Sequence, residues 1–166
     1  MSLAEQFEND DINPIDMAET LAEAHDWAFD RIDEGQIALA VEGAWRTYAL
    51  TLAWSPSDDT LRLVLTFEAE VEPARHPALF DLLNRINDRL WTGAFSWWGK
   101  EGLIVWRYAL QCAGTEGPVP QQIDAMVSAG VDAAERFYPA FQLALWGDTS
   151  PEAAMSTVIA DAYGRA

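Results

Sequence analysis

The stretch from Leu79 to Leu110 limits most strongly what this chain can fold into. Its first part carries apolar residues at helical spacing, which are Leu79, Leu82, Leu83, Ile86 and Leu90. Such spacing places these side chains on one face of a helix, and Gly93 is expected to end that helix. Two short aromatic strands follow, joined by the turn Gly99–Gly102. A helix that leads into a hairpin predicts a mixed fold in which helices pack on an antiparallel sheet.

Three further strands are predicted before this stretch, because the apolar period changes to two after Gln36. Alternating apolar residues mark segments 37–41, 47–54 and 61–67. Alternation of this kind buries one side of a strand and leaves the other side wetter. Together with strands 94–98 and 103–111, these segments predict a five-stranded antiparallel sheet.

Helical patterns surround these strands. The first helix is predicted to begin at Asn13–Pro14, with Asn as its cap, and its apolar face continues to Phe29. A later helix covers residues 123–138, and Pro139 is expected to kink or end it. A last short helix begins after Ser150. The predicted order is α-β-β-β-α-β-β-α-α, which is an α+β fold.

The domain organisation is expected to be simple. Residues 1–13 are polar and acidic and offer little apolar surface to bury, so we expect a disordered lead-in. Residues 14–166 contain no repeat and no long linker, and we predict that they form a single domain.

The charge balance excludes several classes of partner. The chain has 10 Lys and Arg against 27 Asp and Glu, a formal net charge of −17. Nucleic-acid binding needs clustered Lys and Arg, and an anionic membrane surface repels such a chain. Acidity can favour basic partners, although its simplest effect is solubility. With no signal peptide in view and only short apolar runs, we expect a cytoplasmic protein.

No recognisable catalytic motif is present. A Gly-rich phosphate loop and a Gly-x-Ser-x-Gly elbow are both missing from the sequence. The single cysteine, Cys112, lies in a predicted strand and is expected to be a buried structural thiol. His25 and His76 are the only histidines, so no zinc-binding spacing can be assembled. Paired carboxylates remain possible among so many acids, but no pattern selects a pair. We therefore predict no catalytic, cofactor-binding or metal-binding residues.

Interaction residues are the remaining candidates. Eight tryptophans exceed what a core of this size needs, so one or two are expected on a partner-binding face. Asn84 and Asn87 are poor helix-interior residues beside the apolar stripe. They are interpreted first as ties from the helix to a neighbouring strand, and alternatively as a recognition spot. The predicted interaction face consists of Asn84, Asn87, Trp97, Trp98 and Arg107.

A family resemblance follows from the central stretch. The residues that carry it are Leu82, Leu83, Asn84, Asn87, Leu90, Gly93, Phe95, Gly102 and the run Val105–Leu110, with Arg136–Phe141 and Trp146–Gly147 further on. They resemble the YbjN family of bacterial proteins from about Ile32 to the end of the chain. The resemblance implies a sensory transduction regulator with no established catalytic residues. It also implies a fold similar to that of type III secretion chaperones, which are small, acidic and usually dimeric.

These observations lead to one hypothesis with two rivals. The chain is predicted to be a non-enzymatic cytoplasmic module, chaperone-like or regulatory, that binds an unknown protein partner. A homodimer is predicted, formed through the second helix or the sheet. The first rival is a small-ligand protein or enzyme with a pocket between sheet and helices, lined by Trp97, Trp106 and acidic residues. The second rival is a structural domain within a larger assembly.

Overall fold

The computed structural model describes the backbone of residues 13–164 and the side chains of residues 13–160. Its strands are β1 Ala28–Asp33, β2 Gln36–Glu42, β3 Thr47–Ser55, β4 Thr60–Glu68, β5 Ala94–Trp98 and β6 Leu103–Gln111. They form one six-stranded sheet in the order β1-β2-β3-β4-β6-β5, with every neighbouring pair antiparallel. The α+β class and the antiparallel sheet that the sequence predicted are confirmed.

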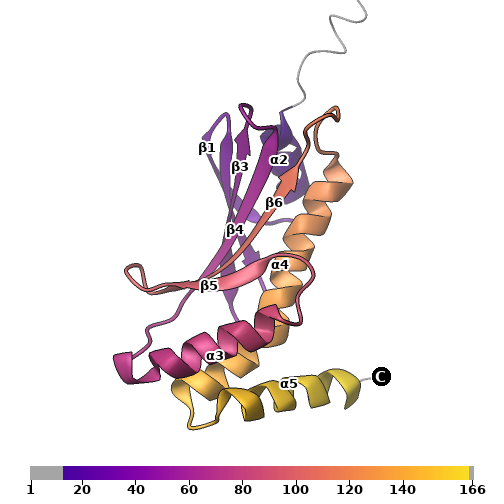
Figure 1. Cartoon of the computed structure of the whole chain (residues 1–166). Helices are drawn as coiled ribbons and strands as arrows, with labels where there is room; N and C mark the ends of the chain where they lie inside the picture. The colour runs from indigo at the N-terminus through magenta and orange to yellow at the C-terminus, as the bar shows by residue number, and fades with distance from the viewer. Residues whose placement is uncertain (1–12, 165–166) are drawn as a thin grey trace, which may run out of the picture.

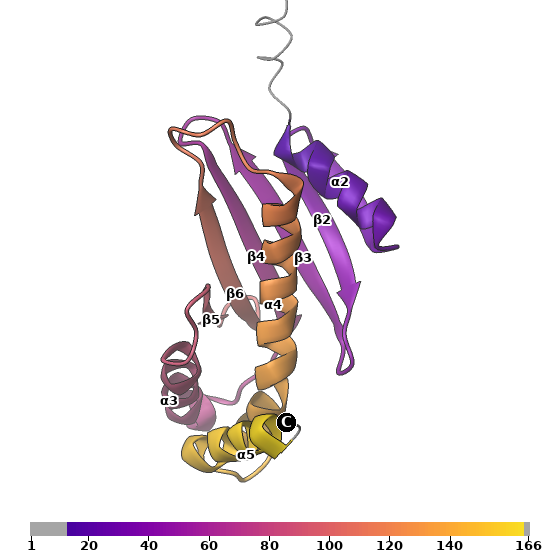
Figure 2. The same cartoon turned by 90° about the vertical axis from the view of Figure 1, so that its right-hand side faces the viewer.

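Helices cover one face and one end of this sheet (Figures 1 and 2). They are α2 Pro14–Ala24, the 3₁₀ turn η1 Pro73–Arg75, α3 His76–Asn87, α4 Pro120–Phe141, the π-helical turn η2 Gln142–Trp146 and α5 Pro151–Gly164. Helix α4 runs along the sheet with α2 beside it, whereas α3 and α5 pack together across one end. Nowhere in residues 13–164 is a helix both long and apolar enough to cross a membrane.

The core lies between the sheet and helices α2 and α4. Cross-strand pairing aligns one row of apolar residues across all the strands, which are Phe29, Leu39, Leu50, Leu65, Trp106 and Phe95. The five on strands β2 to β6 are at most 3 % exposed, and Trp106 is fully buried. Directly opposed residues point to the same side of a sheet, so the row forms a continuous apolar surface for α4.

The opposite face of the sheet carries mainly Ala, Thr and Val, and the described helices leave it uncovered (Figure 2). Strand β6 lies between β4 and β5 rather than at an edge. This position explains why Val105 is fully buried although it points away from the helices. The sequence pattern of β6, apolar on both sides, reflects its place inside the sheet.

The first predicted helix was too long, and a sixth strand, β1, was missed. Helix α2 ends at Ala24, and Asp26 then takes a left-handed conformation with φ 56°. The Trp27 amide donates to the Ala22 carbonyl at 2.9 Å, which closes the helix end. Glycine or asparagine usually fills this position, so an aspartate there gave no stop signal. Strand β1 is an edge strand with little burial, and its apolar alternation is correspondingly weak.

Two other boundaries differ from the prediction. Helix α3 ends at Asn87, well before Gly93, so Gly93 is not its cap. Helix α4 continues past Pro139 to Phe141 and then widens into η2. The predicted apolar stripe of α3 is confirmed, because Leu79, Leu82, Leu83 and Ile86 are all buried. The predicted disorder of residues 1–13 lies, apart from Asn13, outside the described residues.

Candidate functional site

The end of α3 is tied to strand β5 by Asn87. Its side-chain amide donates to the Phe95 carbonyl at 2.9 Å, and its side-chain oxygen accepts from the Phe95 amide at 2.8 Å. A carboxamide that pairs with both backbone groups of one residue replaces the contact a neighbouring strand would make at this edge. The interpretation of Asn87 as a tie between helix and strand is therefore confirmed.

Gly93 lets the connection between α3 and β5 pack directly against the core residue Trp106. It has a left-handed φ of 70°, and a Cβ atom there would lie 2.3 Å from the Trp106 ring. Gly130 of α4 approaches the same ring from the helix side, where a Cβ would lie 2.9 Å away. Trp106 is thus packed between two glycines, and no larger residue fits at either position without displacing a buried indole.

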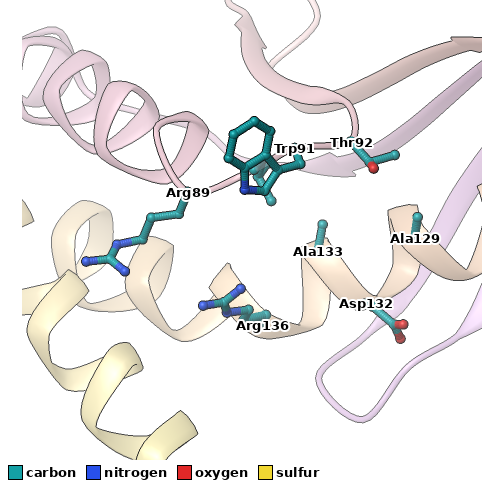
Figure 3. A pocket seen from close by; sticks show the side chains of 8 residues that line it. Arg89, Trp91, Thr92, Ala129, Asp132, Ala133 and Arg136 are labelled. Carbon is teal, nitrogen blue, oxygen red and sulfur yellow. The ribbon is translucent and has the colours of Figure 1, made fainter.

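Asn87 fixes the end of α3 and Gly93 fixes the approach to β5, and Trp91 lies in solvent on the connection between them. Trp91 follows the end of α3 and is 101 % exposed, the highest value among the large apolar residues. Arg89, from the same connection, and Arg136, from α4, line one hollow with it. Figure 3 shows the indole facing α4 across this hollow, with Arg136 on that helix and the Arg89 side chain extending away from the indole. We call Arg89, Trp91 and Arg136 the Arg–Trp patch. An open hollow of about 260 Å³ adjoins it, lined further by Leu90, Thr92, Ala129, Asp132 and Ala133.

The patch is positively charged within a strongly acidic chain. Arg31, Arg62, Arg75 and Arg85 each form an ion pair with a carboxylate. Over the described residues, neither Arg89 nor Arg136 has a carboxylate partner within 4 Å, and the Arg136 guanidinium instead lies 4.9 Å from the Phe137 ring centre. Free guanidinium groups bind carboxylates in a bidentate manner, and an indole supplies apolar contact area. The arrangement can therefore bind another macromolecule without performing chemistry.

Three of the five predicted interaction residues lie on α3 and on the helix side of β5. Asn84 is exposed on α3, and Asn87 is engaged with Phe95. Trp97 packs against the start of α3, with its ring centre 4.5 Å from that of His76. It also lines a second open hollow of about 390 Å³ at the β5–β6 turn.

The other two residues, Trp98 and Arg107, lie on the uncovered face of the sheet. Trp98 pairs with Leu103 at one end of β5, and Arg107 pairs with Ala94 at the other end. They are therefore about 13 Å apart along the strand direction. The structure does not bring the five residues into one face, and a binding role stays a prediction for each of them.

The residues of the Arg–Trp patch were not singled out from the sequence. A signal existed for Trp91, because it lies after the last apolar residue of the α3 stripe and before Gly93. A large apolar residue outside the apolar stripe of the helix is expected to be exposed. No local pattern connects Arg136 to it, since their shared hollow depends on where α4 passes the connection that follows α3.

A catalytic or metal centre has little support among the described residues. No group of three or more His, Cys, Asp or Glu side chains there could hold a metal ion. Burial, and then the hydrogen bond to Glu135, raise the pKa of Tyr48, whose hydroxyl is 2.6 Å from that carboxylate. Burial, and then the charge of Asp59, raise the pKa of the Cys112 thiol. Both shifts keep these groups protonated, and neither residue lines a hollow.

Of the two tryptophans predicted to line a pocket between sheet and helices, Trp97 lines the open hollow at the β5–β6 turn with Glu70 and Glu101, and Trp106 lines neither of the two hollows. Trp106 is fully buried against Gly93 and Gly130. The hollow beside the Arg–Trp patch and the one beside Trp97 both open on the surface of the described chain.

Comparisons with known proteins give a family and a fold. The family model YbjN, described as "Putative bacterial sensory transduction regulator", matches residues 14–143. The crystal structure of YbjN from E. coli is similar at 14 % identity and a TM-score of 0.52, over 90 % of this chain and 93 % of that chain. This likeness supports a shared fold.

Two further solved structures are similar at lower scores. A chain of the HopA1–SchA chaperone–effector complex matches at 17 % identity and a TM-score of 0.46, over 80 % of this chain and 93 % of that one. A chain of the ExsC–ExsE complex matches at 12 % identity and a TM-score of 0.48, over 82 % and 94 %. No curated protein matches the sequence significantly.

Proposed function

Since the chain belongs to the YbjN family, we propose that it is a non-enzymatic module of the bacterial cytoplasm that binds another protein in a regulatory or chaperone-like role. The observation that carries the proposal is Trp91, which is fully exposed at a hollow that Arg89 and Arg136 also line, and these two arginines lack a carboxylate partner among the described residues. Tryptophan and arginine are the residue types most enriched at the energetic centres of protein interfaces.

The support beneath Trp91 favours binding as well. Asn87 and Gly93 fix the two sides of its connection, so a partner meets a loop whose backbone is already ordered. A preordered loop loses less conformational entropy on association, which improves affinity. The adjoining hollow gives a partner side chain a place beside the indole.

Two further expectations remain proposals. The first is that the chain is a homodimer, formed through α3 or through the uncovered face of the sheet. Trp98 and Arg107 lie on that face, and Asn84 is exposed on α3. Light scattering at tens of micromolar, roughly the range in which weak dimers appear, tests this expectation. A monomer at that concentration contradicts it.

The second expectation is that partner recovery depends on the Arg–Trp patch. Tagged wild-type protein, Trp91→Ala and Arg136→Glu are expressed in the native cell, and co-purified proteins are quantified by mass spectrometry. We expect one recurrent partner with the wild type and a loss of at least about tenfold with either variant, the size expected for an interface centre. Gln121→Ala, an exposed change at the start of α4 and outside every predicted interaction residue, serves as the control and is expected to retain the partner.

The same experiment addresses the rival function. A protein that recovers no partner above background and carries a tightly bound metabolite would refute the binding module. Such a result would point to the hollow lined by Arg89 and Arg136, because guanidinium groups also bind small anions.

A further inference from the structure

A second aromatic surface lies on the flank of α4 opposite the Arg–Trp patch. Trp45, from the β2–β3 turn, and Trp146, from η2, both lie near Tyr138, with ring centres 6.2 and 6.3 Å from the Tyr138 ring. Trp45 is 52 % exposed and Trp146 is 48 % exposed. We call Trp45, Tyr138 and Trp146 the Trp45–Trp146 patch. Exposed indole surface contributed by separate elements is typical of an interaction surface.

Glu135 holds the turn that carries Trp45. Its carboxylate accepts from the Ala44 amide at 3.0 Å, the Trp45 amide at 3.4 Å and the Tyr48 hydroxyl at 2.6 Å. A Cβ atom at Gly43 would lie 2.2 Å from the same carboxylate, so only glycine permits this approach. Trp45 is therefore positioned before any partner arrives, which lowers the entropic cost of binding.

Arg46 shows what kind of group these rings accept. Its guanidinium lies 5.5 Å from the Phe67 ring centre and 5.8 Å from the Tyr138 ring centre. It also donates to the Glu68 carbonyl at 3.2 Å. One guanidinium group is thus already stacked on the inner rings of this cluster, while the outer indoles of Trp45 and Trp146 have exposed surface. Tryptophan attracts a cation more strongly than tyrosine or phenylalanine does.

The chain that carries this patch is acidic. Glu42 lies on the strand that enters the turn, and the Glu70 carbonyl accepts from the Trp146 indole at 3.4 Å. Glu42, Glu68 and Glu70 are exposed, and over the described residues none of them forms an ion pair. Alternation along β2 and β4 places Glu42 and Glu68 on the uncovered face of the sheet, so it is the net charge of −17 that attracts a basic partner and repels an acidic one.

We infer that the Trp45–Trp146 patch docks an arginine-bearing segment of a partner protein, whose guanidinium groups stack on the two indoles while the net negative charge of the chain attracts the segment. Arginine fits better than lysine, because its planar group stacks on an aromatic face and is less strongly hydrated. This surface is separate from the Arg–Trp patch, which has the opposite charge. Loss of binding at one patch therefore leaves the proposal for the other intact.

The test uses the full chain and two labelled peptides, one alternating Arg with Ala and the other alternating Lys with Ala. Fluorescence anisotropy is measured at about 0.15 M salt, where charges beyond about 8 Å are screened. We expect the Arg peptide to bind about threefold to fivefold more tightly than the Lys peptide. Trp45→Ala and Trp146→Ala should each weaken Arg-peptide binding by about threefold to tenfold and remove the preference for Arg.

Phe80→Ala is the matched control, since Phe80 is 55 % exposed on α3 and lies outside the patch. It should bind the Arg peptide within about twofold of the wild type. If an Ala variant fails to fold, Trp45→Phe and Trp146→Phe replace it and should lose affinity by a smaller factor. Wild-type affinity in the tryptophan variants, or equal affinity for the Arg and Lys peptides, would overturn the inference, because attraction by net charge alone would then explain the binding.

Discussion

The two flanks of helix α4 carry surfaces of similar construction and opposite charge. On one flank Arg136 joins Arg89 beside Trp91, and on the other Tyr138 lies between Trp45 and Trp146. Arg136 and Tyr138 are separated by about 200° around the helix, since each residue turns it by about 100°. In each surface an indole stands on a connection fixed by a glycine and a polar side chain.

The difference between them lies in the polar side chain and the charge. Asn87 holds the Trp91 connection with a neutral amide, whereas Glu135 holds the Trp45 turn with a carboxylate. Arg89 and Arg136 line the hollow beside the first indole, whereas the turn that carries Trp45 donates its backbone amides to the Glu135 carboxylate. A single helix can thus present two surfaces that select different partners, because screening limits the influence of each charge to its own neighbourhood.

The largest expected effect comes from Gly93→Ala. A left-handed residue with a Cβ costs about 1–2 kcal/mol, and overpacking against the Trp106 ring adds about 1–3 kcal/mol. We expect the free energy of unfolding to fall by about 4 kcal/mol, measured by urea denaturation. Gly114→Ala is the control, because Gly114 has φ 77° but nothing within 4 Å of its Cβ position. Gly114→Ala should lower the free energy of unfolding by only about 1 kcal/mol. Equal losses for the two variants would show that the clash with Trp106 does not contribute.

Asn87→Asp tests the neutral tie beneath Trp91. An aspartate keeps the size of the side chain but faces the Phe95 carbonyl with an oxygen instead of a donor. We expect a loss of about 3 kcal/mol in unfolding free energy, since both oxygens would then lie together without a proton. Asn84→Asp, an exposed change on the same helix, should stay within about 0.5 kcal/mol. A similar loss for both variants would attribute the effect to charge on α3 instead.

Glu135→Gln tests the charged tie beneath Trp45. Glutamine retains one acceptor but turns a donor toward a turn that offers amides and the Tyr48 hydroxyl. Charge-assisted hydrogen bonds are replaced by neutral ones, so we expect a loss of about 2 kcal/mol by thermal unfolding. Glu23→Gln, exposed on α2, should have almost no effect. An unchanged stability for Glu135→Gln would show that the turn holds its shape without the carboxylate.

The raised pKa of Tyr48 predicts a stability change at alkaline pH. Tyrosine ordinarily ionises near pH 10, but burial and the hydrogen bond to Glu135 favour the neutral phenol in the folded chain. Below pH 10 both states are neutral and stability is independent of this group. Above pH 10 only the unfolded state loses the proton, so stability falls by about 1 kcal/mol by pH 11. Unfolding free energies of Tyr48→Phe, measured by urea titration at each pH, should lack this part of the decline. If the wild type and Tyr48→Phe lose stability in parallel above pH 10, Tyr48 is not the group responsible.

The sequence predicted those parts of the fold that depend on local periodicity. Strands with clear alternation, such as those around Leu50 and Leu63, lie in the sheet interior, where burial enforces the pattern. Strand β1 was not predicted, because an edge strand buries few of its side chains and its apolar alternation is weak. In addition, Asp26 ends α2 at a position that glycine usually fills. Helix α4 passes Pro139 because its packing against the sheet outweighs one missing backbone donor.

The site was harder to predict because it depends on contacts between distant segments. Asn87 could be recognised as unusual within a helix, and its pairing with Phe95 fits that signal. Arg136 and Trp91, in contrast, line one hollow only because α4 passes the connection that follows α3. Trp98 and Arg107 were grouped with α3 residues by closeness in sequence, although alternation along β5 and β6 places them on the other face.

The smallest expected effect on stability separates the two tryptophans. Trp91→Ala should change unfolding free energy by less than about 0.5 kcal/mol, since a fully exposed side chain loses no buried area when it is truncated. Trp45→Ala should cost about 1 kcal/mol, because half of its indole is covered and it packs beside Tyr138. Chemical denaturation followed by circular dichroism compares both variants with the wild type. If Trp91→Ala costs as much as Trp45→Ala, then Trp91 supports the fold, and its exposure no longer argues for a partner. If Trp91→Ala leaves the free energy of unfolding unchanged, the exposed indole of Trp91 does not stabilise the folded chain. Association with a partner would then be the way in which this side chain becomes buried.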